Sequence, residues 1–190
     1  MKPYQIRESI SIPYFDHDDK SLGNTIRNSS KRRGMSPVRF ALRKMRNIIL
    51  ARWSYSCPLN KWRVRWHRRR GVTIGEHVYI GQYCVIDNAY PEYVYIEDNV
   101  SLAGSVIVLA HSNPYAHFKN VTESGVSPVV IKQGAWVADG VIILRGVTIG
   151  ENAIVSAGTV VDKDVPANSM AKGNPMKIVA DFSALMEENN

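Results

Sequence analysis

The chain has 190 residues, 45% of them hydrophobic, so it can bury a core and lacks the polar composition of a disordered protein. Two cysteines without paired spacing argue against a disulfide framework, and without a signal peptide or a bilayer-length apolar run we expect a cytoplasmic protein. The net charge of +7 is unevenly spread: residues 31–70 hold fourteen Lys and Arg and no Asp or Glu, whereas residues 71–190 hold six basic and thirteen acidic residues.

Residues 1–70 are expected to form an N-terminal arm followed by a basic amphipathic helical segment. The first thirty residues are polar, neutral overall and carry no recognisable motif. Ser36 and Pro37 are typical of a helix N-cap and a first helical position. An apolar stripe follows at helical spacing, and basic residues lie opposite it. The stripe consists of Val38, Leu42, Met45, Ile49 and Trp53, and the basic residues are Arg39, Arg43, Lys44 and Arg46.

This basic segment has two interpretations that the sequence leaves open. Its apolar stripe can cover the end of the domain that follows, with the charges simply solvated. Alternatively, residues 36–70, which include Trp62, Trp66 and the run from His67 to Arg70, can contact an anionic membrane surface. No nucleic-acid-binding motif accompanies the charge, so we expect no nucleic-acid partner. His67 and His77 are expected to lie on the surface.

From Ile131 to Pro166 the sequence repeats every six residues, six times without a slip. A period of six fits neither a helix nor a strand, so it indicates short strands joined by corners, a β-solenoid. Gly, Asn or Asp recurs at the fourth position, where a corner needs a residue that tolerates φ > 0. Three hexads then close one triangular coil, with the aliphatic first positions stacked inside. The first positions are Ile131, Val137, Ile143, Ile149, Val155 and Val161, and the fourth positions are Gly134, Gly140, Gly146, Asn152, Gly158 and Asp164.

The same phase is present upstream, in hexads that start at Ile74 and continue to Val108. This extends the predicted solenoid over residues 71–180 and leaves residues 181–190 as a tail with a short C-terminal helix. Cys84 falls at the fifth position of its hexad, a position held by small or branched residues. We therefore expect a buried thiol there rather than a metal ligand or a nucleophile.

Two interruptions break the count of hexads. Ten residues separate Ile86 from Ile96, where one hexad needs six, and twenty-three separate Val108 from Ile131, five more than three hexads. Extra residues must leave a solenoid as loops, usually on a functional face. The second excursion, residues 111–127, is therefore expected to protrude from the solenoid.

The stretch from Gly71 to Val179, nearly 60% of the chain, resembles the hexapeptide-repeat acyltransferases. The likeness is greatest in the terminal sequence GAWVADGVIILRGVTIGENAIVSAGTVVDKDVPANSMAKGNPMKIV, which has the KDVP corner, the GNP turn and the basic residue typical of the family. The family includes galactoside, maltose and nodulation-factor acetyltransferases and many surface-polysaccharide O-acetyltransferases. The resemblance implies an all-β solenoid, a left-handed parallel β-helix, and a homotrimer with active sites between subunits. Periodicity alone does not give the hand of the coil.

The resemblance also implies transfer of an acetyl group from acetyl-CoA. A thioester is already activated, so transfer needs a general base for the acceptor's proton and donors for the oxyanion, without a metal or a covalent enzyme intermediate. Histidine is the natural base near neutral pH. The family places its catalytic histidine where the solenoid meets the protruding loop. The matching sequence VIVLAHSNP points to His111, with His117 as the substitute.

Acceptor-binding residues are expected around the two excursions. Asp87 lies at the first, near where the family binds its acceptor, and Asn113 and His117 lie in the second. Gly81 stands where galactoside enzymes have an acceptor-binding Asn, which argues against a simple galactoside acceptor.

Further positions match residues that bind the coenzyme in the family. Trp136 corresponds to an indole beside the pantetheine channel, and packing against a neighbouring subunit is an open alternative for it. Asp139 and Ala157 correspond to positions whose backbone groups bind the pantetheine arm. The residues expected near the coenzyme phosphates are Lys163, Lys172, Gly173, Asn174 and Lys177.

We therefore interpret the chain as an acetyl-CoA-dependent O-acetyltransferase acting on a hydroxyl of a sugar or glycan precursor in polysaccharide biosynthesis. Acetylation of an amino sugar, an amino acid or a xenobiotic remains open, as does a non-catalytic scaffold. A zinc enzyme similar to the γ-type carbonic anhydrases would need His77, His111 and His117 as ligands. The position of His117 in an irregular loop, outside the repeat, argues against that alternative.

Overall fold

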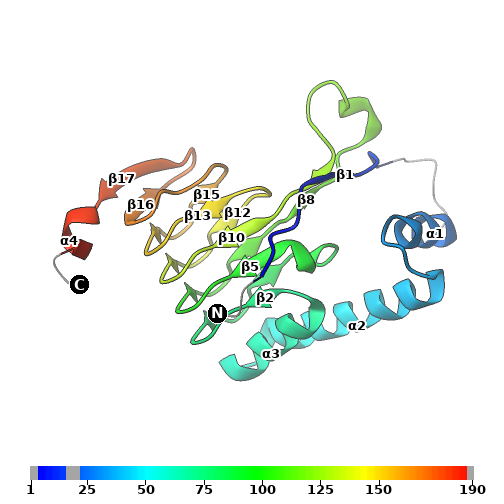
Figure 1. Ribbon diagram of the computed structural model, residues 1–190, viewed down its shortest axis with the longest axis horizontal. Coiled ribbons are helices and arrows are strands. Elements are labelled where there is room, and N and C mark those ends of the chain that lie inside the picture. The colour runs from blue at the N-terminus through cyan, green and yellow to red at the C-terminus, as the bar shows by residue number, and fades with distance from the viewer. Residues whose placement is uncertain (1–3, 16–21, 188–190) are drawn as a thin grey trace.

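The computed structural model describes residues 4–15 and 22–187 and shows a parallel β-helix with helices at its N-terminal end (Figure 1). Three sheets form the walls of the solenoid, and their strands are parallel except for the last one, β17. The first wall consists of β2 (Thr73–Ile74), β5 (Val94–Ile96), β10 (Val129–Ile131) and β13 (Thr148–Ile149). The second wall consists of β3 (Tyr79–Ile80), β6 (Ser101–Leu102), β11 (Trp136–Val137), β14 (Ile154–Val155), β16 (Ser169–Lys172) and β17 (Lys177–Asp181). The third wall consists of β4 (Val85–Ile86), β7 (Ile107–Val108), β12 (Ile142–Ile143) and β15 (Val160–Val161).

Successive coils stack in register, as the hexads predict. In the first wall, Ile74, Ile96, Ile131 and Ile149 stand opposite one another in neighbouring coils. These side chains, like those at the other first positions, are buried and form the interior of the prism. Cys84 is also buried, and burial raises the pKa of its thiol to about 11. The predicted core and the predicted burial of Cys84 are both confirmed.

The corners follow the predicted backbone chemistry with one exception. In the uninterrupted hexads the fourth residue has a left-handed backbone, with φ between 54° and 81°. His77, Tyr83 and Ser105 adopt it too, although side chains of their kind rarely do. Asp164 is the exception, so the prediction of a left-handed corner there was wrong. Its carboxylate instead accepts a hydrogen bond from the N–H of Thr148 at 2.7 Å, which fastens this corner to the coil before it.

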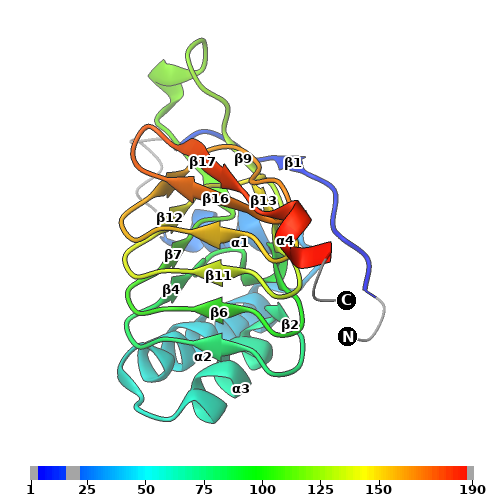
Figure 2. The ribbon, with the colours of Figure 1, turned by 90° about the vertical axis from the view of Figure 1, so that its left-hand side faces the viewer.

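The long excursion is a single corner of the solenoid. Val108 ends a strand of the third wall and Ile131 ends a strand of the first, so one corner takes up all the residues between them. The segment leaves the coil altogether between these two strands. It forms an antiparallel pair, β8 (His111–Ser112) and β9 (Gly125–Val126), and carries the 3₁₀ helix η2 (Ala116–Phe118) beyond it (Figure 2).

The N-terminal arm, residues 4–15, ties this loop to the solenoid. Its strand β1 (Ile10–Ser11) pairs with β9, and the side chain of Ile12 is buried. Tyr4 stacks on Tyr95 of the first wall with 5.2 Å between the ring centroids. The arm carries no motif in the sequence, yet it covers one side of the protruding loop.

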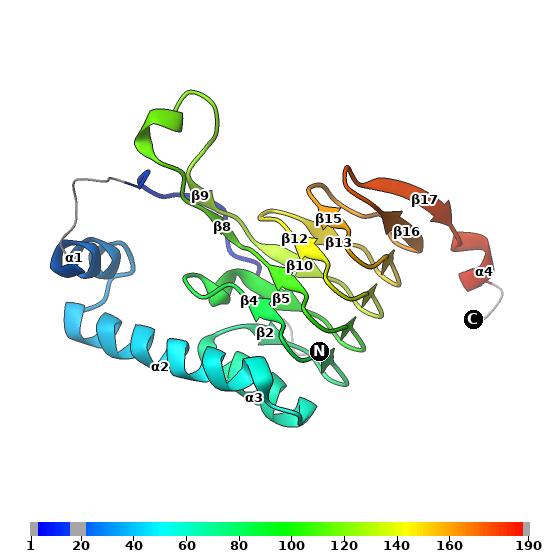
Figure 3. The ribbon, with the colours of Figure 1, turned by 180° about the vertical axis from the view of Figure 1, so that it is seen from behind.

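Three helices precede the first coil: α1 (Leu22–Arg32), α2 (Pro37–Ser56) and α3 (Asn60–Arg70). Figure 3 shows α2 and α3 beneath the first coil, with α1 at the far end of α2. The end of a solenoid exposes backbone N–H and C=O groups that need partners. Asn60 accepts a hydrogen bond from the N–H of Ile80 at 2.9 Å, and the guanidinium of Arg63 donates to the carbonyl oxygen of Ile80 at 2.5 Å. Polar side chains of α3 therefore close the first coil.

Of the two interpretations of the basic segment, the one in which the apolar stripe of α2 covers the coil was wrong. The buried face of α2 consists of Phe40, Asn47, Leu50 and Ser54, whereas the stripe residues are 42–70% exposed. The expectation that His67 lies on the surface was also wrong, because this residue is buried in α3. Burial lowers its pKa to about 3, and the charges of Arg70 and Arg63 add to the effect, so the imidazole is neutral.

None of the helices within residues 4–15 and 22–187 is long and apolar enough to cross a bilayer. A short helix, α4 (Ser183–Glu187), follows β17.

Candidate active site

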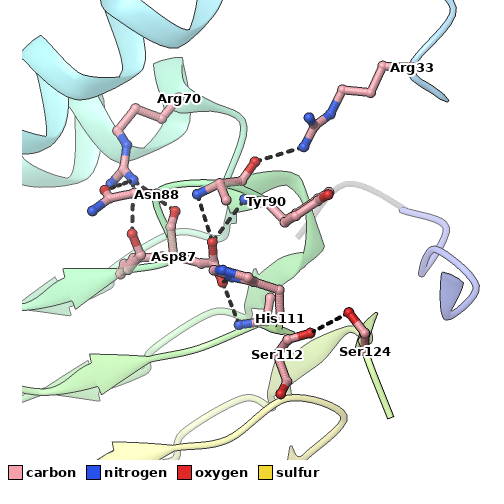
Figure 4. A network of polar contacts seen from close by, with 11 residues as sticks. Arg33, Arg70, Asp87, Asn88, Tyr90, His111, Ser112 and Ser124 are labelled. Carbon is pink, nitrogen blue, oxygen red and sulfur yellow. Dashed lines mark hydrogen bonds and ion pairs between the residues drawn. The ribbon is translucent and has the colours of Figure 1, made fainter. Parts of the chain in front are cut away.

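The corner between the third and first walls brings Asp87 and His111 together (Figure 4). Asp87 follows β4, and His111 begins β8 one coil further along. Ile86 and Val108 are register partners in the third wall, so two residues 24 positions apart become neighbours. The Nδ1 atom of His111 lies 2.6 Å from Oδ2 of Asp87. The pairing thus depends on the stacking of two coils.

The carboxylate of Asp87 is completely buried, and both of its oxygens accept hydrogen bonds. Oδ1 accepts from the N–H groups of Ala89 and Tyr90, each at 2.8 Å, and Oδ2 accepts from that of Ala110 at 2.8 Å. Burial raises the pKa of Asp87, but the hydrogen bond and charge of His111, with the N–H groups of Tyr90 and Ala110, outweigh it. The pKa is therefore lowered overall, and the side chain stays ionised at neutral pH.

The ionised carboxylate determines the tautomer of His111. Because a carboxylate only accepts hydrogen bonds, Nδ1 of His111 must be the donor. In the neutral imidazole Nε2 then carries the lone pair. The side chain is 31% exposed, and its ring lies beside that of Tyr90, with 5.5 Å between centroids. A histidine held in this way can take a proton from a hydroxyl group at Nε2.

Arg70 supports the same corner from behind. Its guanidinium donates to the carbonyl oxygens of Ile86 and Asp87 at 2.9 and 2.8 Å and to Oδ1 of Asn88 at 2.7 Å (Figure 4). Burial lowers its pKa to about 10, opposed in part by the charge of Asp87. The sequence interpretation grouped Arg70 with surface charges. The signal that could have identified it is its spacing from His67, which places both on one side of a helix.

His111 lines a pocket of about 450 Å³ between the N-terminal arm, α1, α2 and this corner. We call it the basic pocket. Asn88 and Asn113 contribute to its wall next to the histidine. Its aromatic lining residues are Tyr14, Phe15, Phe40 and Tyr90, and its basic lining residues are Arg32, Arg33, Arg43 and Lys44.

The residues expected to bind the acceptor do not all reach this pocket. Asp87 corrects the expectation: its oxygens are buried and already hydrogen-bonded, so it orients His111 and offers nothing to an acceptor. Asn113 lines the pocket, and its Oδ1 accepts a hydrogen bond from Ser124 at 3.2 Å. His117 is exposed on η2, where its ring packs 4.0 Å from that of Phe118, and it does not line the pocket.

The residues expected to bind the coenzyme lie mainly along a different edge of the solenoid. Asp139, Ala157 and Gly173 follow strands of the second wall, at its corner with the third. The corner is tightly stacked: Oδ1 of Asp139 accepts from the N–H of Gly104 at 2.9 Å, and its carbonyl accepts from Gly158 at 3.0 Å. The remaining members of the set are Trp136 on β11, Lys163 after β15, Lys172 in β16, Asn174 before β17 and Lys177 in β17, with the indole of Trp136 exposed.

The zinc alternative lacks a ligand set. His77 lies at a corner of the first coil, His111 is bonded to Asp87, and His117 lies on η2. In the part of the chain that the structure describes, no three His, Cys, Asp or Glu side chains come together as a metal site. The three histidines therefore do not form the triad that a carbonic anhydrase needs.

Known proteins resemble the chain in both sequence and structure. Residues 128–163 match the family model of the bacterial transferase hexapeptide (six repeats). Galactoside O-acetyltransferase of Escherichia coli is 32% identical over 59% of this chain and 55% of its own length. The chain spans about half the length of the first curated relatives it matches.

Solved structures share the fold over most of the chain. A maltose O-acetyltransferase from Clostridium difficile is 26% identical, with a TM-score of 0.56, over 74% of this chain and 87% of that one. A hexapeptide-repeat acetyltransferase from Vibrio cholerae, solved with acetyl coenzyme A, has a TM-score of 0.63 over 76% and 90% of the two chains. At 22% identity the second likeness shows the fold alone. The expected left-handed β-helix is thus confirmed, and so is the resemblance to the hexapeptide-repeat acyltransferases.

Proposed function

We propose that the protein transfers an acetyl group from acetyl-CoA to a hydroxyl group of a sugar or glycan precursor, with His111 as general base. The observation that carries this proposal is the hydrogen bond from His111 to the buried carboxylate of Asp87, at the edge of a pocket large enough for a sugar. The relatives support it, since two of them are named as O-acetyltransferases of galactosides and of maltose.

The geometry supports a direct transfer. Acetyl-CoA supplies the acetyl group as an activated thioester. Nε2 of His111 takes the proton of the acceptor hydroxyl while the hydroxyl oxygen forms its bond to the acetyl carbon. As the carbon–sulfur bond breaks, the imidazolium returns this proton to the leaving sulfur. Asp87 stabilises the imidazolium between the two proton transfers, because its charge lies 2.6 Å from Nδ1.

The proposed enzyme is a homotrimer whose active sites lie between subunits. Within one chain, His111 lies at the corner of the third and first walls, whereas Asp139 and Ala157 lie at the corner of the second and third. If the corner of the second and third walls in one subunit faces the corner of the third and first walls in its neighbour, the residues expected to bind the coenzyme lie next to His111. The exposed indole of Trp136 and the exposed side chains of Lys163 and Lys177 fit a thioester arm and its phosphates on that surface.

The domain organisation proposed with this function has three parts. Residues 1–70 supply the arm and the helices, residues 71–180 form the catalytic solenoid with its loop 111–127, and residues 181–190 are a tail.

Acetyl-CoA is expected to bind without added metal and to raise the melting temperature. A ligand that binds only the folded state at 100 times its Kd stabilises that state by about 2.7 kcal/mol. Lys177→Glu should weaken binding, most strongly at low salt, because exposed charges are screened. Lys132→Glu, a matched change at a corner of another wall, should not. Thermal shift and calorimetry measure both effects. Absence of any response to acetyl-CoA in the unmodified protein would refute the proposed function, and a screen of acceptors for thiol release identifies the substrate.

A further inference from the structure

The basic pocket beside His111 carries four cationic side chains and no acidic one among its described lining residues. Two of the cations are already engaged. Arg33 and Arg43 both contact the carboxylate of Glu92, at 3.5 and 3.1 Å, and Arg33 also donates to the carbonyl oxygen of Ala89 at 2.8 Å. These two arginines therefore build the wall of the pocket.

The other two cations, Arg32 and Lys44, differ from these arginines. Among the residues that the structure describes, no carboxylate pairs with Arg32 or Lys44. Within the described part of the chain, the guanidinium of Arg32 donates one hydrogen bond, to the hydroxyl of Ser29 in its own helix at 3.3 Å. Arg32 and Lys44 come from two different helices, α1 and α2, which converge on one cavity. Two positive charges that no described carboxylate pairs with, beside a candidate catalytic histidine, favour an anionic ligand.

We infer that the acceptor is an anionic glycan, one that carries a phosphate or a carboxylate group. This inference rests on the proposed function and specifies its substrate. Arg32 and Lys44 bind the anionic group, because guanidinium and ammonium donors form charge-assisted hydrogen bonds with such oxygens. The sugar ring packs on the aromatic wall, where the ring of Phe15 is exposed, and a hydroxyl reaches Nε2 of His111.

The inference is tested with inorganic pyrophosphate and then with paired acceptors. Calorimetry on the acetyl-CoA-saturated protein should show pyrophosphate binding that weakens at least about 10-fold in a variant with both Arg32→Gln and Lys44→Gln. A control variant with Lys61→Gln and Arg65→Gln, exposed on α3, should bind it normally. No binding at low salt, or equal loss in both variants, would overturn the inference.

Turnover then distinguishes this inference from the proposed function. Each sugar phosphate should be a better acceptor than the same sugar without phosphate, and the pocket variant should lose that preference while its affinity for acetyl-CoA stays unchanged. A sugar diphosphate in solution and one attached to a polyprenol in micelles form the two arms that identify the source of the phosphate. Equal use of charged and neutral acceptors would overturn the inference and leave the acetyltransferase intact.

A second inference comes from the exposed stripe of α2. A helix advances about 100° per residue, so the stripe lies opposite the buried face that contains Phe40 and Leu50. It continues through Trp53 onto α3, where the rings of Trp66 and Trp62 follow at centroid separations of 5.8 Å each. A contiguous apolar surface of this kind marks an interaction site.

The charges around the stripe indicate what covers it. A hollow of about 430 Å³ opens between α2 and α3 beside Leu42. Arg39, Arg46 and Arg69 line it with exposed side chains, together with Arg43 and Arg70, which have partners elsewhere. Two copies of this surface would repel each other, since residues 31–70 hold fourteen cations and no anions. Lipid phosphates above an apolar layer match both features.

We propose that α2 lies on an anionic bilayer, with the stripe in the acyl boundary and the arginines of the hollow on lipid phosphates. The protein should sediment with phosphatidylglycerol-containing vesicles at low salt. It should not sediment with phosphatidylcholine vesicles. A variant with Arg39→Gln and Arg46→Gln should bind about 30-fold more weakly. A variant with Leu42→Gln and Ile49→Gln should also dissociate, whereas Val121→Gln with Leu185→Gln, exposed elsewhere, should bind normally.

The same variants show whether a subunit covers the stripe instead. Light scattering should give one oligomeric state for the unmodified protein and for the Leu42→Gln, Ile49→Gln variant. A change of oligomeric state in that variant, or no binding of the unmodified protein to anionic vesicles, would overturn the membrane proposal.

Discussion

Replacing His111 with alanine is expected to lower kcat by roughly 10²–10⁴-fold, the usual contribution of a general base. The loss follows because, among the described residues, no second base takes the same position: Asp87 is buried, and His117 lies outside the pocket. Affinity for acetyl-CoA should not change, since the residues proposed to hold the coenzyme lie mainly at a different corner of the chain. Initial rates of thiol release, with calorimetry for the coenzyme, measure the effect.

His117→Ala is the matched control for this experiment. His117 is exposed on η2, so its loss should leave kcat within a few fold. Near-normal turnover in His111→Ala would remove His111 from the mechanism. A large loss in His117→Ala alone would transfer the role of base to the protruding loop.

Asp87→Asn is expected to lower kcat by a similar factor, roughly 10²–10⁴-fold, although its side chain does not reach the acceptor. The asparagine side chain has one oxygen, whereas the carboxylate that it replaces has two oxygens that accept hydrogen bonds. With its oxygen toward the N–H groups of Ala89 and Tyr90, its NH₂ group points at Nδ1 of His111 and at the N–H of Ala110. The imidazole must then accept at Nδ1 and carry its proton at Nε2, where it can no longer act as a base.

The lowered pKa of Asp87 also predicts how the stability of the protein depends on pH. The pKa of Asp87 is lowered in the folded protein, so its stabilising contribution is present above the ordinary carboxyl pKa and is lost as the pH falls through the lowered value. Urea unfolding should therefore show less acid sensitivity in Asp87→Asn than in the unmodified protein, and no such change in the exposed control Asp162→Asn. A variant with lowered stability but normal kcat would show that Asp87 only supports the fold.

The sequence by itself determined the solenoid and its interior. A side chain's position in a hexad decides whether it points inward or sits at a corner, and this relation is local. The buried first positions and the left-handed corners could therefore be predicted from spacing alone. His111 could be singled out as the candidate base through the family motif, because the junction of repeat and loop is also a local feature of the chain.

Only the tertiary structure decided how the N-terminal segment packs and how the site is assembled. The spacing of apolar residues along a helix does not determine which side of that helix packs against the rest of the protein. The first coil presents backbone carbonyls, so Arg63 and Arg70 turned inward and the apolar stripe of α2 turned outward. The pair of Asp87 and His111, and the convergence of Arg32 and Lys44 on one pocket, join segments far apart in the chain. Such contacts depend on how coils stack and helices dock, which no local spacing encodes.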